Sequence, residues 1–545
     1  MPVVLIMLFL KSRDPTILKT GRTRKNLLTA LARCVKCFFV TVCIIVAIPA
    51  IGPTSVLGQA KSVSGKSLRA LQDQIRTRKT KFRTEMEELA LAVESRALTE
   101  AAAEIREISL PFEDQTRNVD ALPDRVQEPL PKELPPHQRW RETLKKLRVE
   151  YAQDLYLLSR KALQAPTLSP SLAFHLVREV AFQDPDHKQA RQLLGYELYE
   201  QGWETPFAVS KLKKGEVWDP RWGWLPLPWL ERYEKGERYY NGNWITKSKE
   251  EQVRAEFNRG WVITTEHFEI KTNHSHERGV ELGVKLEDFH RFFLREFAAF
   301  FTTTEQLNHL FEKGPANANA RKHHIYYFRS HDEFNARLRE KQPAVEMING
   351  LYIPTDRIAY FFADPTDPAA NEETLYHEVT HQLLGETTAK TPEVGKDCNF
   401  WVIEGIACYL ESFNRDHGRL TAGDPRNVRI RHARERAAQN LPLKQLSGLG
   451  MREFQHTELE ALRNYYSQGA GLVHFFLNVD DGIYRDEFIQ HLIEVYSPNE
   501  KIRNKSKLSE LTGVTNAELD RQYLEYLKQL PDYSKSQGEP VSRTR

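Results

Sequence analysis

The segment ANEETLYHEVTHQLL, residues 370–384, most constrains what this 545-residue chain can fold into. It contains neither Gly nor Pro, and its apolar residues Leu375, Val379 and Leu383 recur at a helical spacing. Asn371 is the expected cap of this helix. The segment therefore predicts an amphipathic helix that packs one face against the core of its domain.

His377, Glu378 and His381 lie within this predicted helix. Residues four apart share one face of a helix, so both imidazoles can reach the same metal ion. This is the H-E-x-x-H arrangement that zinc hydrolases place on a helix. By composition alone the motif would occur in a chain of this size roughly a few per cent of the time. It indicates a zinc site and needs a third ligand to support it.

The third ligand has a candidate in the segment CNFWVIEGIACYLESF, residues 398–413. A catalytic zinc takes three protein ligands and keeps one position open. The segment predicts an apolar helix interrupted by the carboxylate of Glu404, and a charged group on a buried helix needs a partner that a metal would provide. The alternative is that Glu404 faces solvent or an arginine.

HEVTH, 22 intervening residues and EGIACYLE together resemble the gluzincin zinc peptidases, in particular the peptidase MA-like domains of secreted bacterial proteins. The resemblance covers about residues 262–495. It implies an α+β gluzincin-like fold with a small mixed sheet and a helical zinc-binding half. It also implies that His377, His381 and Glu404 bind Zn²⁺ and that Glu378 is the general base for hydrolysis of peptide bonds.

The surroundings of the zinc are less clearly indicated. Thermolysin-like enzymes carry an Asp four residues after the glutamate ligand, where this chain has Cys408. Glu411 shares the helical face and could replace that Asp, although a surface carboxylate is the more expected role. By the same resemblance Tyr465 and Tyr466 are candidate oxyanion donors and His474 is a weaker one, with packing as the equal alternative for all three.

The remainder of the metallopeptidase-like region, residues 262–530, shows strand patterns first and helical patterns afterwards. WVITTEHFEIKTN (261–273) and HHIYYF (323–328) predict strands, and LYIPTDRIAYFF (351–362) predicts a hairpin. Strands followed by helices indicate an α+β domain. By resemblance, the hairpin before the zinc helix is expected to pair with substrate backbone at the edge of the cleft.

The regions ahead of this domain differ in composition. Residues 61–135 predict a solvated helical stalk followed by a Pro-rich linker, and residues 136–202 predict a helical hairpin without a 34-residue repeat. Residues 203–261 hold seven of the nine tryptophans among turn signals, which predicts a small β-rich unit. The indoles could stack on sugar rings, but core packing is the more expected role. Residues 531–545 are expected to be a disordered tail.

Residues 1–60 form a basic leader that runs into the apolar stretch CFFVTVCIIVAI. This pattern predicts a signal peptide cleaved after Ala60 or near Gly52, with an uncleaved anchor at residues 37–51 as the alternative. Without the leader, 69 basic and 73 acidic residues leave a net charge of −4, which argues against a nucleic-acid partner. Only Cys398 and Cys408 would then remain, and two cysteines do not decide the compartment.

The sequence therefore predicts a secreted or cell-envelope zinc peptidase that acts on a peptide or protein substrate, with membrane contact only if the leader is retained. Two alternatives stay open. One is a non-catalytic zinc-binding scaffold, and the other is a glycan- or cell-wall-binding protein that uses the Trp-rich region.

Overall fold

The computed structural model describes residues 57–112, 122–165, 167–302, 304–313, 321–343, 345–387, 394–416 and 419–532. The anchor alternative and nearly all of the predicted leader lie outside these residues, as does the predicted tail beyond residue 532. Across the described segments, no helix is both long enough and apolar enough to cross a membrane. The first helix begins at Leu57, ahead of the predicted cleavage position at Ala60.

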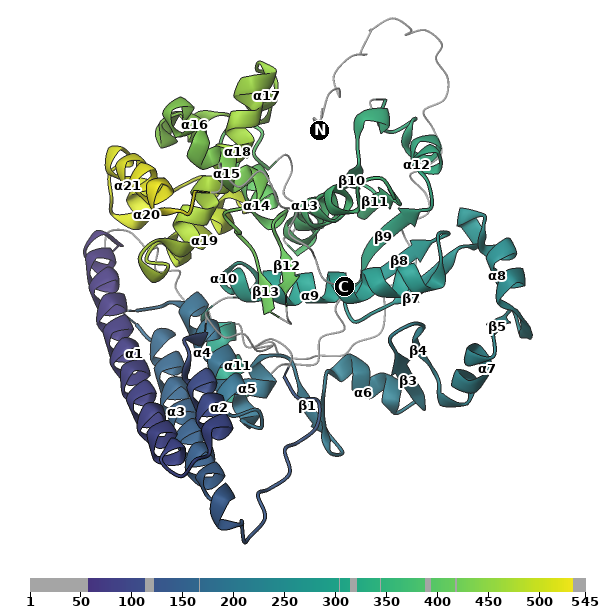
Figure 1. Cartoon of the computed structure of the whole chain (residues 1–545). Coiled ribbons are helices and arrows are strands. Elements are labelled where there is room, and N and C mark those ends of the chain that lie inside the picture. Colours follow the sequence, from purple (N-terminus) through teal and green to yellow (C-terminus); the bar gives the residue numbers. More distant parts are fainter. Residues whose placement is uncertain are drawn as a thin grey trace, which may run out of the picture.

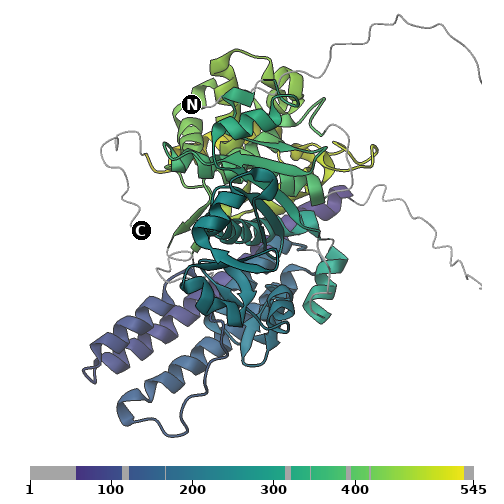
Figure 2. The same cartoon turned by 90° about the vertical axis from the view of Figure 1, so that its right-hand side faces the viewer.

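The first part of the molecule is a helical unit. Its helices are α1 (Leu57–Glu94), α2 (Thr99–Ser109), α3 (Trp140–Ala162), α4 (Pro170–Gln183) and α5 (Lys188–Leu193). Helix α11 (Thr304–Lys313) joins it from later in the chain, since Leu307 and Phe311 belong to the same apolar core. In Figure 2 the paired helices α1 and α2 project toward one end of the molecule.

The solvated stalk expected at residues 61–135 is contradicted by this packing. Met86 and Ala90 of α1 are fully buried, and Ile105 of α2 is buried with them in the core that includes α3 and α4. Phe82 of α1 stacks on Tyr151 of α3 with ring centroids 4.0 Å apart. The sequence pattern is helical in either case, and it does not reveal that a later segment covers the apolar stripe.

Three successive β-hairpins, each followed by a short helix, make up the Trp-rich region. The units are β1–β2–α6 (Glu197–Tyr199, Gly202–Glu204, Pro206–Leu212), β3–β4–α7 (Glu216–Asp219, Gly223–Pro226, Leu230–Glu234) and β5–β6–α8 (Glu237–Tyr240, Asn243–Thr246, Lys247–Arg254). The predicted short strands are confirmed. Each unit opens with Glu and carries a Trp in its second strand, at a spacing of about 20 residues that is typical of a short repeat.

A five-stranded sheet forms the centre of the next domain (Figure 1). Its strands are β7 (Trp261–Thr264), β8 (Phe268–Thr272), β9 (His323–Phe328), β10 (Gly350–Ile353) and β11 (Ile358–Phe362), in the order β10-β11-β9-β8-β7. The two end pairs, β7–β8 and β10–β11, are antiparallel, whereas β8–β9 and β9–β11 are parallel. All strands expected from alternation are present, and β10 forms one edge of the sheet.

Helices complete the domain. Three of them pack on the sheet: α9 (His276–Glu296), α12 (His331–Leu338) and α13 (Pro368–Thr387). The short helix α10 (Ala298–Phe301) follows α9 and packs on α4 and α19 (Arg485–Val495). Helix α14 (Phe400–Leu410) and the hairpin β12–β13 (Asn414–Asp416, Arg419–Thr421) follow. The remaining helices are α15 (Val428–Glu435), α16 (Leu443–Gly448), α17 (Met451–Gln455), α18 (Leu459–Asn478), α19 (Arg485–Val495), α20 (Leu508–Thr512) and α21 (Asn516–Gln529).

One continuous apolar core joins the sheet to these helices. It extends along the chain from Trp261 of β7 to Leu527 of α21 and includes Trp401 of α14. A mixed sheet with helices packed around it is an α+β arrangement, which confirms the predicted α+β class. This core fixes α13 and α14 side by side.

Candidate metal centre

Helix α13 carries the H-E-x-x-H motif and begins with a cap other than the predicted one. Asp367 Oδ1 accepts a hydrogen bond from Ala370 N at 3.0 Å, and Pro368 opens the helix. Asn371, the expected cap, instead donates from its side chain to Phe362 O at 2.9 Å, which ties the helix to β11. The cap prediction was wrong because Asp367, four residues before Asn371, offers the same local signal.

The apolar face of α13 lies where the sequence placed it. Leu375, Val379 and Leu383 are each at most 3% exposed. Since His377 and Glu378 sit between these positions, packing of this face holds both side chains inside the domain. They are 7% and 5% exposed, respectively.

Helix α14 is buried along its whole length, Glu404 included. Gly405 explains how it can pack so closely, because a Cβ at this position would lie 2.8 Å from the backbone of Gly469 in α18. Only a residue without a side chain permits this approach. The glycine of the E-G-x-A element therefore holds α14 against α18 and sets the position of Glu404 beside α13.

The two helices bring three ligand atoms together. His377 Nε2 lies 3.2 Å from His381 Nε2, and Glu404 Oε2 lies 3.5 Å and 3.8 Å from these two nitrogens. Ligands about 2.1 Å from a tetrahedral ion are about 3.4 Å from one another, so the three atoms already have the separations that zinc requires. We refer to His377, His381 and Glu404 as the α13–α14 cluster.

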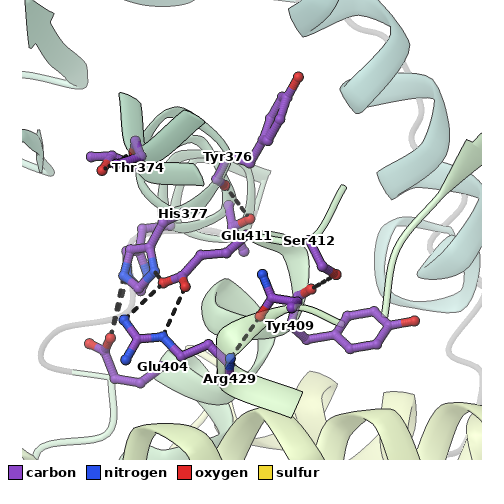
Figure 3. A network of polar contacts seen from close by, with 12 residues as sticks. Thr374, Tyr376, His377, Glu404, Tyr409, Glu411, Ser412 and Arg429 are labelled. Atoms are coloured by element: carbon purple, nitrogen blue, oxygen red, sulfur yellow. Dashed lines mark hydrogen bonds and ion pairs between the residues drawn. The ribbon is translucent and has the colours of Figure 1, made fainter. Parts of the chain in front are cut away.

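The other nitrogen of His377 is fixed by Glu411. The Nδ1–H of His377 donates to Glu411 Oε1 at 2.9 Å, and Arg429 of α15 donates to both carboxylate oxygens at 2.9 Å and 3.3 Å (Figure 3). Glu411 is 8% exposed, so the surface role expected for it was wrong. A carboxylate behind a histidine ligand orients the ring and increases the basicity of its other nitrogen.

The electrostatics of the cluster favour a cation between its members. Burial would lower the pKa of His377, but contacts with Cys408, Glu404 and Glu411 raise it well above its usual range. Burial lowers the pKa of His381 to about 4. Burial would raise the pKa of Glu404, but a hydrogen bond with His377 and the charges of both histidines lower it. An ionised carboxylate beside two imidazoles is the donor set of a zinc site.

The charge of Glu411 is also maintained. Burial would raise its pKa, yet Arg429 and His377 lower the pKa of Glu411 to about 2. Cys408 lies beside His377 and Glu411. Its Sγ and one ligand atom of each of these two residues lie within 4.8 Å of one another. It is a free thiol, as is Cys398, so these two cysteines are not joined. Burial raises the pKa of the Cys408 thiol to about 11.

Glu378 stands apart from the three ligand residues. Its Oε2 accepts a hydrogen bond from the backbone N–H of Tyr352 in β10 at 2.8 Å. Burial raises the pKa of Glu378 to about 7. A carboxylate tuned to this range can take up a proton and release it near neutral pH.

The three candidate oxyanion donors differ in position. Tyr466 is buried, its hydroxyl makes no hydrogen bond of normal geometry within the described residues, and Gln455 approaches it. Burial and the neighbouring Glu404 raise the pKa of Tyr466 well above its usual range. For Tyr465 the structure records a ring contact with Phe454 at 5.4 Å. His474 has both nitrogens engaged, since Nε2–H donates to Gly423 O and Nδ1 accepts from Tyr526.

Sequence reasoning missed two participants. Arg429 is one of several arginines in RNVRIRHARERA, and nothing local separates it from the others. Tyr352 contributes its backbone, which no side-chain pattern can predict. A comparison with protein-family models found no match, and neither did a search of curated proteins. The geometry of the site is therefore the basis for its interpretation.

Proposed function

We propose that the chain is a zinc-dependent peptidase of the gluzincin type, with His377, His381 and Glu404 as the metal ligands. The convergence of three ligand atoms at 3.2–3.8 Å carries this proposal. It is supported by the Glu411–Arg429 pair behind His377, because an accidental motif would not require an oriented histidine.

Zinc, when bound at this cluster, supplies Lewis acidity that polarises the scissile carbonyl and lowers the pKa of the attacking water to about 7. Glu378 takes the proton from that water and passes it to the leaving amine. The Tyr352 N–H holds Oε2 of Glu378, which leaves Oε1 to handle the proton. The hydroxyl of Tyr466 is the best-placed donor for the developing oxyanion, since it is buried near Glu404.

The free edge of strand β10 favours a peptide as the substrate. Tyr352 pairs with Ala359 of β11, yet its N–H is bonded to Glu378 and so points away from that partner. The N–H and C=O of one residue point to the same side of an antiparallel strand, so the Tyr352 carbonyl also faces the free edge. A substrate in extended conformation can therefore hydrogen-bond to β10 beside the base.

The glycan-binding alternative receives less support from the Trp-rich units. Arg232 lies 3.8 Å from the ring centroid of Trp244, and Arg221 lies 3.9 Å from that of Trp222. An indole face covered by guanidinium is less accessible to a sugar ring. The scaffold alternative shares the metal site and differs only in turnover.

The test combines metal content with peptidase activity. We expect the purified full chain to hold zinc and to cleave a mixture of unstructured peptides, with activity lost on chelation and restored by Zn²⁺. His377→Ala, His381→Ala and Glu404→Ala should each lose this zinc and the activity together, since each removes one of three protein ligands. Zinc at this cluster without cleavage of any peptide would support the scaffold alternative instead.

The role of β10 has a separate test. Binding of a non-hydrolysable peptide analogue should slow hydrogen exchange at the amides of residues 350–353. Unchanged exchange there, with the analogue bound, would contradict pairing of substrate with this strand.

A further inference from the structure

A second group of two histidines and a carboxylate lies on α9 and in the turn before β8. Glu287 and His290 are three residues apart on α9, so they share a face of the helix. His267 precedes β8, in the turn after β7. One ligand atom from each of the three lies within 4.8 Å of the others. We refer to His267, Glu287 and His290 as the α9 cluster.

The carboxylate of this cluster is held in a fixed orientation. Glu287 Oε1 accepts hydrogen bonds from Thr265 Oγ1 at 2.6 Å and from His267 N at 2.7 Å. Its Oε2 lies 2.7 Å from His267 Nδ1. Burial would raise the pKa of Glu287, but the hydrogen bond with His267 lowers it. The Glu287 side chain is therefore an ionised and oriented ligand candidate.

His290 is the second histidine of the cluster, and its ring contacts the rings of His267 and Phe268. It is 6% exposed and makes no hydrogen bond to any residue that the structure describes. Burial lowers its pKa well below the usual range, so the ring is neutral and can donate a lone pair. Because His290 lines a cavity, an ion can reach its ring from that space.

A cavity lies beside the α9 cluster and is separate from a cavity of about 450 Å³ between α1, α4 and α19. Its volume is about 330 Å³, and all three cluster residues line it. Leu194, next to α5, and Phe301 of α10 form part of its apolar wall, so it lies where the helical unit meets the sheet domain. Exogenous ligands of a metal at the cluster would enter from this space.

Ring stacking is the competing explanation. The rings of His267 and His290 are 3.8 Å apart between centroids and are inclined by 24°. In this arrangement the two rings cannot both direct a lone pair at one ion, so binding requires one ring to rotate about its Cβ–Cγ bond. Since His267 and His290 both line the cavity, we infer that this rotation takes place on its side.

We propose that His267, Glu287 and His290 form a second binding site for a transition-metal dication, independent of the α13–α14 cluster. Two imidazoles and one carboxylate suit Zn²⁺ and similar ions, whereas Ca²⁺ and Mg²⁺ prefer oxygen ligands. The bound ion would join the turn before β8 to α9. Arg178, Arg291 and Arg295 also line the cavity.

The stoichiometry of bound Zn²⁺ tests this site. The full chain is loaded with Zn²⁺, dialysed against metal-free buffer and analysed for zinc per folded chain. We expect two equivalents in the wild type and one in Glu287→Gln and in His290→Ala. His377→Ala should also hold one equivalent, bound at the α9 cluster. His323→Gln is the matched control, since its ring lies 6.1 Å from His290 outside the cluster, and it should hold two.

The outcomes separate this inference from the proposed function. One equivalent in the wild type that persists in His290→Ala and disappears in His377→Ala would overturn the second site. One equivalent with the opposite dependence would support it and contradict the first. If His290→Ala does not fold, Glu287→Gln provides the test, because Gln keeps the shape of the side chain. The Zn²⁺ affinity of the α9 cluster should fall at least tenfold in that variant.

Discussion

The α13–α14 cluster and the α9 cluster contain the same residue types but differ in what surrounds them. In the first, the Nε2 atoms of His377 and His381 face each other at 3.2 Å, and a separate carboxylate, Glu378, stands beside them. In the second, Glu287 is occupied by hydrogen-bond donors, and the histidine rings are stacked. The residue types are the basis for proposing a metal in both clusters, whereas Glu378 and the edge strand β10 are the basis for proposing catalysis at the first.

The largest effect is expected from the residue that only the first cluster has. Glu378→Gln removes the proposed base but keeps the shape of the side chain and an acceptor for Tyr352 N–H. Turnover should fall by at least ~100-fold with zinc retained, because general bases contribute at least this much. Steady-state kinetics and zinc analysis of the same preparation provide the measurement.

Glu372→Gln on the same helix is the control for this substitution. Its carboxylate pairs with Lys285 and contacts none of the three ligand residues. It should retain both zinc and turnover. Loss of zinc from Glu378→Gln would show that Glu378 has a structural role and would remove the main difference between the two clusters.

The hydroxyl of Tyr466 offers the next test. Tyr466→Phe should lower kcat by about 100-fold with little change in KM, if the hydroxyl donates to the oxyanion. Tyr465→Phe should have a much smaller effect, since the structure records for Tyr465 only the ring contact with Phe454. Unchanged kcat in Tyr466→Phe would assign this hydroxyl to packing.

Glu411→Gln tests whether orientation of His377 matters. Gln preserves the shape but removes the charge that faces both His377 and Arg429. Zinc affinity should fall by roughly 10–100-fold, as for other groups behind metal ligands. Competition with a chromogenic chelator measures this, with the partly exposed Glu435→Gln on α15 as control. A zinc affinity of Glu411→Gln equal to that of the wild type would mean that Glu411 does not contribute to metal binding.

Local patterns predicted the elements that carry the site. Alternation identified the strands β7 to β11, and the spacing of Leu375, Val379 and Leu383 identified the buried face of α13. These signals depend on neighbouring residues, so the sequence contains them directly. Glu404 was also identified locally, because a carboxylate in an apolar helix stands out.

Contacts between distant segments were not predictable in the same way. Glu411 lies in the same apolar segment as Glu404, but its burial depends on Arg429, which reaches it from α15. The stalk interpretation failed for a similar reason, since α3 covers the apolar stripe of α1. The hairpin units were not predicted because their spacing of about 20 residues differs from the 34-residue period of helical hairpin repeats.

A histidine outside both clusters shows how burial alone changes the pKa of a histidine. The expected effect on stability is the smallest of those predicted. His491 of α19 is 2% exposed, and burial lowers its pKa to about 4, although Glu494 opposes the shift. Because the folded pKa lies below the unfolded value of about 6.5, its contribution to stability is complete above pH 6.5 and is lost as pH falls toward 4. Between pH 7.5 and 5.5 the loss is roughly 1 kcal/mol.

His491→Leu should therefore lose less stability over this range than the wild type in urea unfolding, whereas His137→Gln at an exposed position should match the wild type. If His491→Leu shows the same pH dependence as the wild type, burial leaves the proton affinity of His491 unchanged. The lowered pKa of His381 and that of His290 would then need another cause.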